Sequence, residues 1–127
     1  MQYFVTGATG FIGKRLVKKL LERKGAVVYF LLRKESEAKV ADLRHYWGAP
    51  AARVVPVFGD ITAKKLGVTP ANLKKLKGQI DHFYHLAAVY DLGADEASQI
   101  AVNIEGTRNT LELAQAIKAG HFHHMSS

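Results

Sequence analysis

Eight residues near the amino end, from Thr6 to Gly13, read TGATGFIG and carry three glycines at intervals of three. A strand-forming run at 2–6 precedes them, and from Phe11 apolar residues recur at helical spacing until Gly25. A turn between a strand and a helix can bind phosphate, because free N–H groups and the positive end of the helix dipole face it. The stretch therefore predicts a cradle for a nucleotide's phosphates. The alternative is a tight turn that holds no ligand.

Each glycine has its own expected task. Gly7 suits the positive φ of a sharp turn, Gly10 lets the backbone approach a pyrophosphate, and Gly13 lets the helix pack against the strand. We expect a cofactor to contact the turn and the first helical residues, which are Gly7, Thr9, Gly10, Phe11, Ile12 and Gly13.

Strand-like and helix-like segments alternate along the whole chain. Strands are predicted at 2–6, 26–32, 54–58, 82–86 and 122–126, and helices at 11–24, 35–47, 96–119 and, as a short one, from Thr69-Pro70. This alternation predicts one α/β domain over residues 1–127, a doubly wound parallel sheet of the Rossmann type, in strand order 3-2-1-4-5, between two helical layers. Its ligand crevice should lie at the carboxyl ends of the strands. Run 26–32 should be buried on both faces, and Pro56 indicates an edge strand.

Composition excludes several classes of protein. The chain has no cysteine, no apolar run approaching the roughly 20 residues that cross a bilayer, and no opening signal segment, so we expect a cytoplasmic protein without a membrane partner. The net charge of +7 comes from lysines and arginines spread over helical faces, so a nucleic-acid partner is not expected, although a basic mouth would suit a phosphate-rich ligand. The histidines near the carboxyl end have no cysteine or carboxylate close by, so no metal is expected. The oligomeric state stays open.

The end of the second strand bears on the choice of cofactor. An acid there would bind the 2′-hydroxyl of NAD, whereas this chain has Arg33 and Lys34, with no acid before Glu35. A guanidinium pairs with a 2′-phosphate that a carboxylate would repel, so the sequence favours NADP (NADPH) and leaves NAD as the alternative. Arg44 could supply a second contact. Arg33 could also be only a solvated charge at a strand end.

Five short motifs, in this order, resemble those of the extended short-chain dehydrogenase/reductase family. They are TGATGFIG, Gly59-Asp60-Ile61, His85-Leu86-Ala87-Ala88, Asn103-Ile104-Glu105-Gly106-Thr107 and His124-Met125-Ser126-Ser127. Within that family, FGDITAKKLGV followed by HFYHLAAVYDL is similar to the thioester- and acyl-reductase branch.

The resemblance implies roles for individual residues. Asp60 and Ile61 would flank the adenine, and Asn103 would order water and a catalytic lysine. Residues beside the ribose and nicotinamide would be Ala87, Ala88 and Val89. Ser127, with Ser126 as second choice, would position the substrate carbonyl, while a tyrosine of a YxxxK pair protonates the substrate oxygen. Plainer interpretations are a turn residue for Asp60, an exposed polar residue for Asn103, and packing beside the cofactor for His85.

No YxxxK pair occurs in the 127 residues. We therefore expect the cofactor-binding part of a longer enzyme, truncated before that pair and the substrate-binding region, and inactive by itself. The leading hypothesis is an NADP(H)-dependent oxidoreductase that transfers hydride to a small-molecule carbonyl or acyl thioester. The alternatives are a nucleotide-sugar epimerase or dehydratase that uses NAD, and a non-enzymatic module that senses NADP.

Overall fold

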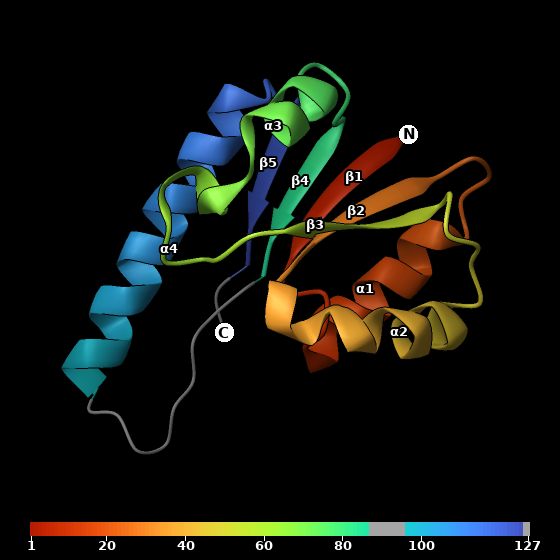
Figure 1. Ribbon diagram of the computed structural model, residues 1–127, viewed down its shortest axis with the longest axis horizontal. Coiled ribbons are helices and arrows are strands. Elements are labelled where there is room, and N and C mark those ends of the chain that lie inside the picture. Colours follow the sequence, from red (N-terminus) through yellow and green to blue (C-terminus); the bar gives the residue numbers. More distant parts are fainter. Residues whose placement is uncertain (87–95, 126–127) are drawn as a thin grey trace.

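The computed structural model describes residues 1–86 and 96–125. Five strands form one parallel sheet in the order β3-β2-β1-β4-β5, which confirms the predicted topology (Figure 1). The strands are β1 (Gln2–Thr6), β2 (Val27–Leu32), β3 (Val54–Phe58), β4 (His82–His85) and β5 (His121–His124). Because all strands run the same way, their carboxyl ends share one edge of the sheet, where predicted cofactor residues follow β1, β2 and β3.

Helices cover both faces of the sheet, as Figure 1 shows. The α-helices are α1 (Phe11–Leu21), α2 (Val40–Trp47), α3 (Pro70–Leu76) and α4 (Glu96–Ala116), and short 3-10 helices lie at η1 (Lys34–Lys39) and η2 (Lys64–Gly67). One buried cluster joins the sheet to α1 and α2, and a second joins the opposite face to α3, η2 and α4. No helix within residues 1–86 and 96–125 is both long and apolar enough to cross a membrane.

Several element boundaries differ from those predicted. The single helix expected at 35–47 is divided into η1 and α2, because η1 buries none of its residues and regular helix begins where Val40 can pack. Helix α4 ends at Ala116, three residues early, where Lys118 takes a positive φ of 53°. Helix α1 ends at Leu21, and β5 spans His121–His124 instead of 122–126.

Strand β3 lies at the sheet edge, as Pro56 predicted. The amide of Val28 donates to the carbonyl of Arg53, and the amide of Gly59 donates to the carbonyl of Leu32. The main-chain N–H and C=O groups of odd-numbered residues in the segment 53–59 therefore point toward β2. The main chain of Pro56 points away from β2, so its missing N–H costs no bond within the sheet.

Strand β2 alternates buried with half-buried residues, which corrects the expected full burial of both faces.

Candidate cofactor-binding site

The turn after β1 leaves the start of α1 open. Gly7 has a φ of 77°, as predicted, and its carbonyl accepts the Gly10 amide at 3.1 Å. Gly10 is the N-cap residue and offers no side-chain cap, and the first helical turn carries no acid. Phe11 and Ile12 are 74% and 57% exposed. The first N–H groups of α1 thus face an accessible space with the positive end of the helix dipole behind them, which fits an anionic pyrophosphate.

Gly10 and Gly13 differ in the space around them. A Cβ on Gly10 would lie 3.4 Å from the carbonyl oxygen of Gly7, an ordinary contact. A Cβ on Gly13 would overlap that same oxygen and crowd the Cα of Ala8. Gly13 therefore allows close packing, as predicted, but the surface it packs on is the turn instead of the strand. Among residues 1–86 and 96–125, packing leaves room for a side chain at Gly10, as it does not at Gly13.

A buried hydrogen-bonded group lies below the turn. His85, at the end of β4, is 1% exposed, and its Nδ1 lies 2.6 Å from the hydroxyl of Thr6 at the end of β1. Its Nε2 lies 3.3 Å from the hydroxyl of Thr107 on α4, and the Thr6 hydroxyl also accepts the Leu86 amide at 3.2 Å. Burial, with a smaller effect from His124, lowers the pKa of His85 to about 4. A neutral ring thus ties together the ends of two central strands and the helix beside them.

We expect the stability of the protein to fall in mild acid through His85. Its pKa of about 4 lies below the ordinary 6.5, so the unfolded chain takes up a proton first as the pH falls. The contribution of His85 to the free energy of unfolding is complete above about pH 6.5 and is lost progressively toward pH 4. The total loss from this residue is at most about 3 kcal/mol. Denaturant titrations from pH 7.5 to 4.5 should give a shallower pH dependence for His85→Gln than for the wild type. The exposed residue His45, as His45→Gln, is the control, and an unchanged slope in His85→Gln would contradict the expectation.

Asp60 and Arg33 flank the carboxyl ends of two neighbouring strands. Leu32 of β2 pairs with Phe58 of β3, so the residues that follow each strand lie at the same edge. The Asp60 carboxylate accepts bonds from the Thr62 amide at 2.9 Å and the Thr62 hydroxyl at 2.8 Å. These bonds, and to a lesser degree the charge of Arg33, lower the pKa of Asp60. Asp60 is therefore an ionised turn residue, and its predicted place beside the adenine stays a prediction.

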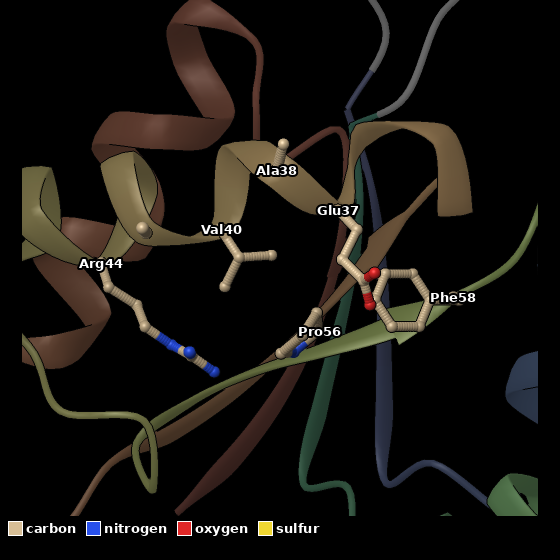
Figure 2. A pocket seen from close by; sticks show the side chains of 7 residues that line it. Glu37, Ala38, Val40, Arg44, Pro56 and Phe58 are labelled. Carbon is tan, nitrogen blue, oxygen red and sulfur yellow. The ribbon is translucent and has the colours of Figure 1, made fainter.

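Arg44 lies in a groove along the outer edge of β3. The groove has a volume of about 460 Å³ and is lined by Glu37, Ala38, Val40, Ala41, Arg44, Pro56 and Phe58 (Figure 2). The Arg44 guanidinium donates to the carbonyl of Val54 at 3.4 Å from Nε and 3.3 Å from Nη2. Val54 is level with Val28 at the amino end of β2, whereas Arg33 follows the carboxyl end. The structure does not bring these two arginines together, and the role of Arg44 stays a prediction.

The remaining predicted residues fall into two groups. Ala87, Ala88, Val89, Ser126 and Ser127 lie outside the described residues. Asn103 is half-buried on α4, three residues before Gly106.

His121 and His123 of β5 stack with His82 of β4 on one face of the sheet, whereas His124 stacks on His85. His82 Nδ1 lies 3.0 Å from His123 Nε2, and the His82 ring also stacks on His121. Burial, followed by the charges of His121 and His123, lowers the pKa of His82. Within the part of the chain that the structure describes, no three His, Cys, Asp or Glu side chains are placed to hold a metal ion.

Sequence reasoning gave no individual role to three polar residues, Thr6, Thr107 and Asn109, the first two of which lie in the quoted motifs. Asn109 is 2% exposed, and its Nδ2 donates to the Ile61 carbonyl at 3.1 Å. A signal was present, because Asn109 falls in helical phase with Gly106, Leu113 and Ile117, which face the core. A polar residue on an apolar helix face requires a buried partner.

The sheet order, the glycine turn and the open start of α1 define a nucleotide-binding Rossmann domain. The chain belongs to the male sterility protein family, whose model matches residues 5–127.

Relatives and solved structures agree with that assignment. The chain is 32% identical to a linear gramicidin synthase of Brevibacillus parabrevis over 97% of its length and 3% of that protein's. It is 26% identical to the Drosophila melanogaster fatty acyl-CoA reductase wat, over 90% of this chain and 25% of that protein. The terminal R domain of the myxalamid pathway superposes with a TM-score of 0.75 at 31% identity, covering 99% of this chain and 34% of that one.

A structure from a different enzyme class is also similar. Bacillus cereus UDP-glucuronic acid 4-epimerase in complex with NAD gives a TM-score of 0.70 at 30% identity, over 100% of this chain and 40% of that chain. The chain thus spans about a third or less of the gramicidin synthase, the fatty acyl-CoA reductase and the R domain that it matches. It is an NAD(P)-binding domain homologous to those of acyl-CoA and peptide-synthetase reductases.

Proposed function

We propose that this chain is the NADPH-binding part of a reductase that acts on an acyl thioester or another small carbonyl compound. The observation that carries the proposal is Arg33, a cation that follows β2 at the edge where the glycine turn also lies. The relative named as a fatty acyl-CoA reductase supports a thioester, because acyl-CoA is one.

Arg33 is the better of two cations for the 2′-phosphate. The neighbouring Lys34 is paired with Glu37 at 2.8 Å, and its Nζ lies 4.4 Å from the centre of the Phe58 ring. Those contacts hold Lys34 toward the groove along β3. Arg33 instead lies near Asp60 at the carboxyl ends of β2 and β3, where its charge contributes to lowering the pKa of the Asp60 carboxyl. A guanidinium at that position can donate two parallel bonds to a phosphate.

The residues of the turn fit the pyrophosphate of the same cofactor. The open N–H groups at the start of α1 would hold it, with Gly10 leaving the approach clear and Thr9, Phe11 and Ile12 around it. NADPH would supply the hydride when bound. The role of this chain is to bind and orient the cofactor. In the whole enzyme, Ser127, with Ser126 as second choice, would position the substrate carbonyl. Asn103 would order water. Adenine would lie against Asp60 and Ile61, and the ribose and nicotinamide against Ala87, Ala88 and Val89.

Calorimetric titration of the chain with NADPH and NADH tests the proposal. We expect NADPH to bind at least about tenfold more tightly at low salt, the effect of one charge-assisted bond. Tighter binding of NADH would instead favour the epimerase-like alternative, whose similar structure holds NAD. Failure of both cofactors to bind would overturn the proposal. A chain that binds NADPH while a longer form has no reductase activity would favour the NADP-sensing module.

A further inference from the structure

The loop after β3, residues 59–67, is folded back on itself. The Asp60 amide donates to the Leu66 carbonyl at 2.8 Å, the Ala63 amide to the Asp60 carbonyl at 3.0 Å, and the Leu66 amide to the Ala63 carbonyl at 2.9 Å. Lys65 and Leu66 have positive φ values of 49° and 58°, and the Leu66 side chain is fully buried. These bonds fix the shape of the loop, and the Gly59 amide, which donates to the Leu32 carbonyl at 3.1 Å, ties its first residue to the end of β2. They do not fix how Ile61 and the residues after it lie relative to α4.

Helix α4 supplies that second constraint. Figure 1 shows the segment between β3 and α3 lying along α4. Asn109 reaches across with Nδ2 and donates to the main-chain carbonyl of Ile61 at 3.1 Å. One turn earlier on α4, a Cβ on Gly106 would lie only 3.0 Å from the Cγ1 of Ile61. The loop is thus hydrogen-bonded to Asn109 and packed directly on the backbone of Gly106.

An asparagine at this position is costly to the helix. Its propensity inside a helix is poor, and burying its amide is tolerated only with a partner. An apolar residue would fill the same core position, as Leu113 does on the same helix. What the amide adds is a directional bond to the main chain next to Asp60. That carboxylate is in turn held by Thr62 and lies within the field of Arg33.

We propose that Asn109 is a positioning residue for the adenosine half of the cofactor, an inference that rests on the proposed function. Its amide holds the main chain at Ile61 against α4, and with it the Asp60–Ile61 segment against which the adenine would lie. Gly106 sets the same position by letting Ile61 lie against the helix backbone.

Binding of adenosine 2′,5′-bisphosphate and of NADPH to the whole chain tests the assignment by calorimetry. Asn109→Leu keeps a similar volume and removes the donor. Thr110→Val is the matched control, because Thr110 is also fully buried on the same turn and also loses one bond, from its hydroxyl to the Gly106 carbonyl at 2.7 Å. We expect Asn109→Leu to bind both probes about tenfold more weakly, the equivalent of one such bond, and Thr110→Val to bind them within about twofold of the wild type. All variants are compared at a temperature where each is folded.

A second substitution separates positioning from general loss of stability. Gly106→Ala raises helix propensity while its new methyl group displaces Ile61. It should therefore weaken both probes severalfold without a lower unfolding temperature, and it serves also if Asn109→Leu does not fold.

The possible results bear on the two proposals differently. Wild-type affinity in Asn109→Leu, or an equal loss in Thr110→Val, would overturn the positioning role and leave NADPH binding intact. Wild-type affinity in Gly106→Ala would also overturn it. A wild-type chain that binds neither probe would overturn the proposed function, and the role of Asn109 with it.

Discussion

Replacing Gly10 with valine should abolish NADPH binding while the domain remains folded. The residue has φ −75° and ψ 171°, an extended conformation that suits a β-branched side chain, and a Cβ would lie 3.4 Å from the Gly7 oxygen. The valine methyl groups would occupy the space in which a pyrophosphate meets the first amides of α1. We expect at least about a hundredfold loss of affinity by calorimetry, because close backbone contact with the phosphates would be lost.

Two further variants make the Gly10 result specific. Gly10→Ala adds only the Cβ that the turn can accept, so its affinity should lie between those of the wild type and the valine variant. Gly13→Ala places its Cβ on the Gly7 oxygen, so this variant should lose stability as well as binding. Thermal unfolding measured beside the titrations separates the two effects. Unchanged affinity in a folded Gly10→Val would mean that the turn holds no phosphate.

The topology could be predicted because its signals are local and its connections are constrained. Glycines at 7, 10 and 13 fall between a strand and a helix, and apolar runs alternate with helical patterns along the chain. Right-handed crossovers leave few ways to order such strands. The short helix predicted from Thr69-Pro70 begins there, and Thr69 is its N-cap, with a hydroxyl that accepts the Asn72 amide at 3.3 Å.

The site was predictable only in part, because its remaining features depend on contacts distant in sequence. Asn109 meets Ile61 from 48 residues away, and the Thr6 hydroxyl meets His85 from 79. Arg44 was predicted as a possible second contact beside Arg33, yet its guanidinium bonds to Val54 on the edge strand. No spacing rule of a single sequence shows which carbonyl a long side chain will reach. The divided helix at 34–47 has the same origin, since burial of Val40 decides where regular helix begins.

Arg33→Asp should reverse the cofactor preference of the protein. The substitution replaces a cation with an anion at the end of β2, beside the ionised Asp60, so a 2′-phosphate would meet two negative charges. Loss of one charge-assisted bond is worth about 1.5–3 kcal/mol, or roughly one to two powers of ten in NADPH affinity. NADH carries a hydroxyl at the same position, so its affinity should change little or rise. The measurement is the ratio of the two dissociation constants in the wild type and the variant.

Salt and a neighbouring charge change supply the controls for Arg33. Its side chain is exposed, so the wild-type advantage of NADPH should shrink as ionic strength rises from about 0.01 M to 1 M, where the screening length falls from about 30 Å to 3 Å. Lys34→Asp makes the same change of charge one residue away, at a side chain that is paired with Glu37. Its effect on the ratio should therefore be several times smaller than that of Arg33→Asp. Equal effects of the two substitutions would mean that Arg33 contributes only to a general positive potential and makes no specific contact with the 2′-phosphate. An unchanged ratio in Arg33→Asp would remove the basis for assigning NADPH.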